Sequence, residues 1–119
     1  MKRASKDSSG PSEPSGPSAM LAQRFPVGKA ALKAFCRRYR IRRLALFGSV
    51  LSDRFGPESD VDVLVEFEAG EIPGLEFFDA ERELSELVGR KVDLNTPAWL
   101  SRYFRAQVLS TAVDRYARP

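Results

Sequence analysis

The chain has 119 residues, with 19 Lys and Arg against 16 Asp and Glu, a net charge of +3, one Cys and no His. The lack of His excludes a Ser/His/Asp triad, a Cys/His dyad and a His-ligated zinc site, and a single Cys excludes an internal disulfide and Cys-rich metal sites. If the protein is an enzyme, we expect its chemistry to depend on carboxylates and on a metal ion held by oxygen ligands.

The chain begins with a segment, residues 1–23, that we predict to be a disordered tail, followed by one domain over residues 24–119. The first 19 residues contain six Ser, three Pro and two Gly and almost no large apolar side chain, which is too little apolar surface to offset the entropy lost on folding. Two interpretations stay open, a translation start at Met20 and a genuine flexible tail. No apolar run approaches the roughly 18 residues of a membrane span, and no apolar signal segment follows Lys2 and Arg3. We therefore expect a cytoplasmic protein.

Three elements are predicted in the first half of the domain. Apolar residues recur at helical spacing between Gly28 and Arg40, which predicts an amphipathic helix with Cys36 on its buried face. Residues 41–47 are typical of a strand that ends at Gly48. Residues 61–67 alternate between apolar and polar side chains in the first positions, the period of a half-buried strand.

The second half predicts a helix, a strand and a helix. A helical stripe from Phe77 to Val88 ends at Gly89, which suits the left-handed residue after a helix. Residues 91–95 form a short alternating strand, and Thr96 with Pro97 is typical of a helix start, predicting a helix with one apolar face from Leu100 to Tyr116. The fold class is therefore α/β (α+β), a small mixed sheet of three or more strands flanked by helices.

Candidate catalytic groups lie on the predicted strands. Asp60 and Asp62 are two residues apart, so both side chains leave the same face of the strand, with Cβ atoms on the order of 6.5 Å apart. Asp93 alternates with Val92 and Leu94 in the same way on the next strand and can complete a cluster of three carboxylates. Such a cluster repels itself unless a cation lies between its members, and it suits one or two Mg²⁺ ions.

A phosphate-binding turn is predicted directly after the first strand. Gly48 lets backbone amides approach an anion closely, and the hydroxyl group of Ser49 offers one more donor. A strand followed by Gly-Ser and a single Asp-x-Asp are each weak signals. Their joint occurrence with Asp93 is far more specific for phosphate chemistry.

These motifs resemble those of a known family. Gly48-Ser49, ten further residues and then Asp60-Val61-Asp62, within LALFGSVLSDRFGPESDVDVLVEF, look like the signature of the polymerase-beta-type nucleotidyltransferases. The short length resembles the minimal nucleotidyltransferase (MNT) antitoxins that pair with HEPN toxins. The resemblance implies a nucleotidyltransferase fold, Mg²⁺ and ATP as cofactor and nucleotide donor, and AMP transfer to a hydroxyl group, with tyrosine of the toxin as the expected acceptor. It also implies roles for six residues: Gly48, Ser49 and Arg54 bind the nucleotide, and Asp60, Asp62 and Asp93 bind metal and serve catalysis.

Two alternatives to an active enzyme remain. Many relatives have Arg three residues after the motif Ser, where this chain has Ser52 with Arg54 nearby, and this departure favours an antitoxin that only binds its toxin, through a vestigial site. Residues 24–43 hold eight Lys and Arg and no acid, whereas residues 44–89 hold two Arg and twelve acids. The basic stretch favours either a solvated helix face, a nucleic-acid-binding module or a surface that steers an acidic partner. The domain has no room for a second-substrate domain, so we expect a protein partner and a hetero-oligomer with it.

Overall fold

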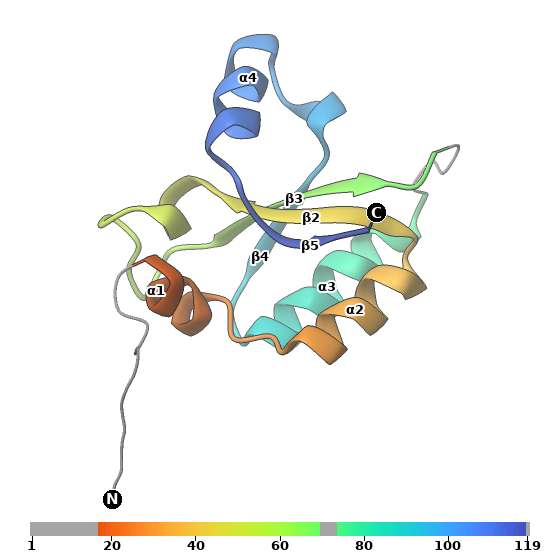
Figure 1. The fold of residues 1–119 in the computed structure, drawn as a ribbon, viewed down its shortest axis with the longest axis horizontal. Helices are drawn as coiled ribbons and strands as arrows, with labels where there is room; N and C mark the ends of the chain where they lie inside the picture. Colours follow the sequence, from red (N-terminus) through yellow and green to blue (C-terminus); the bar gives the residue numbers. More distant parts are fainter. Residues whose placement is uncertain (1–16, 70–73, 119) are drawn as a thin grey trace, which may run out of the picture.

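The computed structural model describes residues 17–69 and 74–118. They form four α-helices and four strands (Figure 1), and two short 3₁₀ helices, η1 and η2, follow strands β2 and β4. In chain order the elements are α1 (Pro17–Arg24), α2 (Lys29–Arg38), β2 (Ile41–Phe47), η1 (Gly48–Leu51), β3 (Val61–Phe67), α3 (Glu76–Val88), β4 (Val92–Asn95), η2 (Pro97–Trp99), α4 (Arg102–Thr111) and β5 (Val113–Ala117).

The four strands form one mixed sheet in the order β4-β3-β2-β5. Strand β2 is antiparallel to both β3 and β5, whereas β3 and β4 run parallel. The register places Asp62 of β3 opposite Phe47 of β2 on one side and Asp93 of β4 on the other. One end of the sheet therefore gathers the motif residues of three strands.

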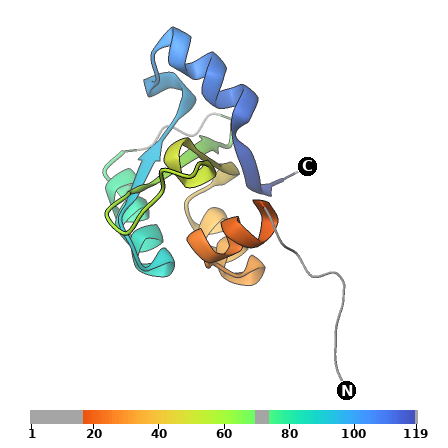
Figure 2. The same cartoon turned by 90° about the vertical axis from the view of Figure 1, so that its left-hand side faces the viewer.

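Helices cover the two faces of the sheet unequally. Helices α2 and α3 lie side by side along one face, and α4 projects from the opposite face (Figures 1 and 2). The main core between the sheet and α1, α2 and α3 is built from alternate strand residues such as Leu44, Leu46, Val63 and Val65, all fully buried. A smaller core lies under α4 and contains Phe47, Leu64, Leu100 and Val108.

The predicted elements up to residue 95 are confirmed. The helical stripe before Arg40, the strand over 41–47 and the alternating strand over 61–67 correspond to α2, β2 and β3. Cys36 is fully buried, as expected from its spacing. Gly89 ends α3 with φ of 85°, in the left-handed region that favours glycine.

The prediction of a disordered tail is wrong for residues 17–23, and residues 1–16 lie outside the described residues. Residues 17–24 form helix α1, whose Leu21 packs in the main core together with Phe25, one turn later. Burial of this i, i+4 apolar pair stabilises the helix. The prediction was based on the composition of the N-terminal segment as a whole, which does not register one buried pair at its end.

The prediction of one continuous helix up to Tyr116 is also wrong. Thr96 precedes the short helix η2, Leu100 is extended, and α4 begins anew after Ser101, whose side chain accepts a hydrogen bond from the Phe104 amide at 3.3 Å. Beyond Ala112 the chain becomes strand β5, because the edge of β2 offers backbone hydrogen-bonding partners that an isolated helix end does not. No helix within the described residues is long and apolar enough to cross a membrane.

Candidate active site

The turn after β2 brings the chain against Asp62. Gly48 opens η1 with φ of 77°, a conformation that residues with a Cβ rarely adopt. A Cβ atom at this position would lie 2.3 Å from the Oδ2 atom of Asp62. Glycine is therefore required twice here, for the backbone conformation and for the close approach of the turn to the carboxylate.

The three predicted carboxylates interact electrostatically. Burial, as the main cause, together with the negative charges of Asp93 and Asp60 raises the pKa of Asp62 to about 6. Asp62 is half-buried, whereas Asp60 and Asp93 are exposed. Because Asp62 and Asp93 are paired in register on neighbouring parallel strands, about 4.8 Å apart, their side chains leave the same face of the sheet.

The side chains do not form a ready-made metal site. Within residues 17–69 and 74–118, no group of three or more Asp, Glu, His or Cys side chains is arranged so that it could hold a metal ion. The donor set nevertheless suits a divalent cation, because a cation among the three carboxylates would relieve the repulsion that raises the pKa of Asp62. Metal binding by these residues stays a prediction.

Helix α3 positions the strand that carries Asp93. The Ser85 hydroxyl group accepts a hydrogen bond from the Val92 amide at 3.0 Å, and the Glu81 carboxylate accepts one from the Leu94 amide at 2.9 Å. These side chains occupy the outer edge of β4, where no further strand is paired among the described residues. The residues on both sides of Asp93 are therefore fixed to α3.

A small cavity opens beside Gly48. Its volume is about 200 Å³, and it lies between the β2–η1 turn and helix α4. The rings of Phe47 and Phe104 meet edge to face with centroids 6.2 Å apart. The walls are largely apolar, with polar groups from α4; the lining residues are Phe47, Gly48, Leu51, Phe104, Gln107, Val108 and Thr111. Sequence reasoning missed Gln107 and Thr111, although their spacing from Phe104 places them on one helix face.

Two arginines hold the loop that joins the Gly-Ser turn to Asp60, and sequence reasoning missed this contact. Arg24 donates hydrogen bonds to the carbonyl oxygens of Val50 and Ser52, both at 2.8 Å. Arg90 donates to the carbonyl oxygens of Gly56 and Ser59 at 2.8 and 2.9 Å. We call these two side chains the arginine clamp.

The clamp also contains an aromatic ring. The guanidinium carbons of the two arginines lie 4.8 and 4.4 Å from the centroid of the Phe55 ring. Cation–π contacts of this kind contribute on the order of 0.5–1 kcal/mol each at accessible sites. The hydrogen-bonding partners of the two arginines are backbone carbonyls, which exist at every residue. No motif in the sequence therefore marks the clamp.

The predicted nucleotide-binding residues differ in their placement. The Ser49 hydroxyl group has no hydrogen-bonding partner among the described residues and remains available as a donor. Arg54 is exposed, and within the described part of the chain its guanidinium group makes no hydrogen bond or ion pair. Arg24, in contrast, places its guanidinium group on the Ser52 carbonyl, directly beside the Gly-Ser turn.

Comparison with known proteins identifies the family. The model of the nucleotidyltransferase domain matches residues 29–115, which include the Gly-Ser turn and all three carboxylates. The chain belongs to the nucleotidyltransferase domain family. A curated relative, the protein adenylyltransferase MntA of Thermococcus cleftensis, is 41% identical over 63 residues, which are 52% of this chain and 62% of the relative. The matched stretch thus spans about six tenths of the length of MntA and of a Methanocaldococcus jannaschii relative that is 43% identical over 63 residues.

Solved structures share this fold. A structure assigned as a minimal nucleotidyltransferase is 31% identical, with a TM-score of 0.62 over 81% of this chain and 92% of that chain. A complex of a Shewanella oneidensis HEPN toxin, tri-AMPylated, with an MNT antitoxin is 18% identical, with a TM-score of 0.53 over 73% of this chain and 67% of that chain. The second likeness concerns the fold alone. The predicted fold class is confirmed.

Proposed function

We propose that this nucleotidyltransferase domain transfers AMP from ATP to a hydroxyl group of a HEPN-type toxin, with tyrosine as the acceptor, and so acts as an antitoxin. The observation that carries the proposal is the convergence of Gly48, Asp62 and Asp93. The register of three strands and the close approach of Gly48 bring this turn against the carboxylates of Asp62 and Asp93, which supports a phosphate-binding role for the turn. The name of the relative MntA supports adenylate as the transferred group.

The Gly-Ser turn and the cavity beside it suit a nucleotide. Backbone amides at a glycine turn and the unpartnered Ser49 hydroxyl group can donate hydrogen bonds to the triphosphate. The apolar cavity between Phe47 and Phe104 can take part of the nucleoside. Arg24 brings positive charge beside Ser52, the position where many relatives have Arg, and so joins Arg54 as a candidate for binding the phosphates.

The three carboxylates are the proposed ligands of Mg²⁺. Asp60, Asp62 and Asp93 supply oxygen atoms, the donors that this ion prefers. When bound, Mg²⁺ would neutralise the charge of the phosphates and of the pyrophosphate leaving group. The chain's own part is to hold Asp62 half-buried against the Gly48 turn, so that a phosphate on the turn meets the carboxylates.

The transfer itself needs a proton acceptor. The acceptor oxygen forms a bond with the α-phosphorus of ATP, and the bond from that phosphorus to the bridging oxygen breaks, releasing pyrophosphate. Asp93 is exposed at the edge of the site and takes the proton from the acceptor hydroxyl group. Its neighbours are fixed by Ser85 and Glu81, which limits how far the base can move.

A protein partner also fits the surface. Large apolar side chains are exposed at the start of α3 and on η2 and α4, and contiguous exposed apolar surface often marks an interface. Tyr103 is 85% exposed; the others include Leu75, Phe78, Trp99 and Phe104. We propose that this side of the domain, next to the cavity, receives the toxin and presents its hydroxyl group to Asp93.

A second candidate is an antitoxin that neutralises the toxin by binding alone. Ser52 in place of the arginine of many relatives favours it, as does the absence, in the described part of the chain, of a ready-made ligand set. Nucleic-acid binding by the basic stretch is disfavoured, because several of its arginines are already ion-paired. Arg38 pairs with Glu83, and Arg42 pairs with Glu66. Arg43 pairs with both Glu66 and Asp114.

Intact-mass spectrometry of the toxin decides between the two candidates. The full chain is incubated with ATP, Mg²⁺ and a HEPN-type toxin, and we expect one or more AMP additions and a fall in the toxin's ribonuclease activity. Asp60→Asn should abolish the additions, whereas Asp53→Asn, which removes an exposed carboxylate outside the site, should not. Suppressed toxin activity at an unchanged toxin mass would establish the binding-only antitoxin.

A further inference from the structure

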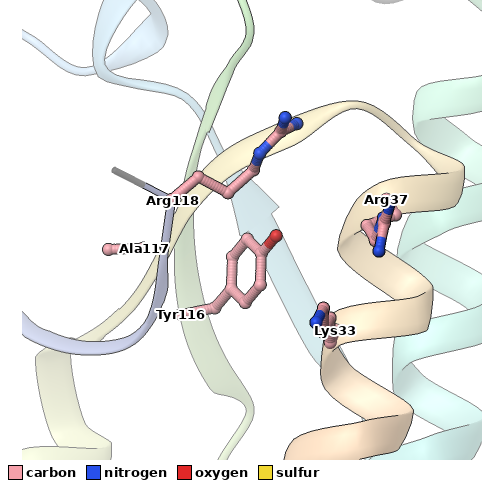
Figure 3. A pocket seen from close by; sticks show the side chains of 5 residues that line it. All are labelled: Lys33, Arg37, Tyr116, Ala117 and Arg118. Atoms are coloured by element: carbon pink, nitrogen blue, oxygen red, sulfur yellow. The ribbon is translucent and has the colours of Figure 1, made fainter.

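A second concave site lies between helix α2 and strand β5, away from the carboxylates. The cavity has a volume of about 370 Å³, within the range of small-molecule sites. Its lining is strongly basic (Figure 3); the residues are Lys33, Arg37, Tyr116, Ala117 and Arg118. We call this site the α2–β5 pocket.

The pocket is built from rigid elements. Lys33 and Arg37 are one turn apart on α2, so both side chains leave the same face of the helix. Tyr116 is half-buried against the main core, and its ring lies between β5 and α2 (Figure 3). The backbone amide of Arg118 donates a hydrogen bond to the Arg42 carbonyl at 2.9 Å.

The pocket and the carboxylate site lie on opposite faces of the sheet. Tyr116 packs against the main core on the α2 side, whereas Asp62 shares its face with Leu64, which is buried under α4. Along β2, Tyr116 is paired with Leu44 and Asp62 with Phe47, three residues further on. A ligand in the α2–β5 pocket therefore does not contact Asp62.

Positive charge in the pocket is incompletely neutralised. Arg118 forms an ion pair with Glu68. Lys33 and Arg37, in contrast, form no ion pair or hydrogen bond through their side chains with any residue that the structure describes. Since cations held close together repel one another, an anion bound between them is stabilised by both.

Within the pocket lining, the uncompensated charge is limited to Lys33 and Arg37; Lys29, one turn before Lys33, is also unpaired among the described residues but does not line the pocket. In the basic stretch outside the pocket, Arg38, Arg42 and Arg43 are already ion-paired with carboxylates. A nucleic-acid strand is bound by a groove of cations that follows several successive phosphates. Two free cations, a third that is paired and one tyrosine hydroxyl group in a single hollow suit one small polyphosphate better.

We propose that the α2–β5 pocket binds the phosphate groups of a small polyphosphate, either a nucleoside di- or triphosphate or inorganic pyrophosphate. Lys33 and Arg37 supply the charge, and the Tyr116 hydroxyl group donates a hydrogen bond. The carboxylates and a metal ion take no part, so the site is independent of the transfer reaction.

The test is a titration of the full chain carrying Asp60→Asn, in EDTA, which removes metal-dependent binding at the proposed active site. ATP, ADP, pyrophosphate and adenosine are added separately, and binding is measured by calorimetry and by backbone amide NMR shifts. We expect saturable binding of the three phosphate compounds, with shifts at Lys33, Arg37 and Tyr116, and no binding of adenosine. Tighter binding of ATP than of pyrophosphate would identify a nucleotide as the ligand, and the reverse would identify pyrophosphate.

Variants of the lining residues locate the binding. The double variant Lys33→Gln with Arg37→Gln should raise the dissociation constant at least tenfold. Tyr116→Phe, which keeps the ring and removes the hydroxyl group, should raise it several-fold. The matched double variant Lys91→Gln with Arg102→Gln removes two exposed charges that are likewise unpaired among the described residues and should leave the dissociation constant within twofold.

Three results would overturn the proposal. The first is no saturable binding of any phosphate compound, and the second is equal weakening in both double variants. The third is salt-sensitive binding of a single-stranded RNA that is tighter than that of ATP or pyrophosphate, which would assign the surface to nucleic acid. Circular dichroism melting of each variant shows that the fold is intact.

Discussion

Replacing Asp62 by Asn should stabilise the metal-free domain at neutral pH while removing a proposed metal ligand. The pKa of this carboxyl group is raised from 3.8 to about 6, mainly by burial. The folded state therefore binds the proton more tightly than the unfolded state does, so stability falls as pH rises from about 4 to 6 and stays low above that. Asn carries no charge, so the variant escapes this loss.

The size of the effect follows from the shift. Each pKa unit corresponds to about 1.4 kcal/mol, so a shift of this size gives an upper limit of roughly 3 kcal/mol. Asp62 is only half-buried and solvent screens its charge, which reduces the expectation to about 1 kcal/mol. At a pH above 7, the melting temperature of Asp62→Asn should then be about 4–8 °C higher than that of the unsubstituted protein, for a domain of this size.

Urea denaturation in EDTA at pH 8 and near pH 4 measures the effect. We expect the free energy of unfolding of Asp62→Asn to be about 1 kcal/mol higher than that of the unsubstituted protein at pH 8. Near pH 4 the two values should be almost equal. Asp53→Asn is the control and should show no such dependence. Mg²⁺ should raise the stability of the unsubstituted protein and not of the Asp62 variant. A variant that is less stable at pH 8, or equally stabilised at both pH values, would refute the electrostatic reasoning.

Four further substitutions and one labelling experiment test other parts of the structure. Gly48→Ala should lower the free energy of unfolding by about 1–2 kcal/mol because of the positive φ, and should abolish AMP transfer by displacing the Asp62 carboxylate. The control Gly89→Ala has a similar φ and open space around a Cβ, so it should lose stability but keep transfer. Arg90→Gln should raise the KM for ATP and speed amide exchange in the loop after η1, and unchanged exchange would remove the residue from loop positioning. Leu21→Ala should cost about 2–3 kcal/mol in urea denaturation; a smaller loss than 1 kcal/mol would mean that α1 is dispensable. Cys36, whose pKa burial raises to about 12, should resist alkylation in the folded protein, and rapid labelling would contradict its burial.

Local sequence patterns determined most elements up to residue 95. The alternation of Val61, Val63 and Val65 with Asp62, Leu64 and Glu66 predicted β3, because every second residue of a strand faces the same side, here the main core. Gly89 marked the end of α3, because glycine adopts the left-handed conformation without steric cost. The spacing of Asp60, Asp62 and Asp93 likewise singled out three carboxylates, whose catalytic roles stay predictions.

Tertiary structure decided what depends on distant partners. The helical pattern after Ser101 continues past Ala112, yet residues 113–117 form a strand, because the open edge of β2 supplies hydrogen bonds that local propensity does not register. Leu21 and Phe25 form a buried pair only once the main core exists. The arginine clamp binds backbone carbonyls, and the α2–β5 pocket joins side chains from residue 33 to residue 118. Such contacts arise from the folding of distant segments onto one another, so neither composition nor spacing reveals them.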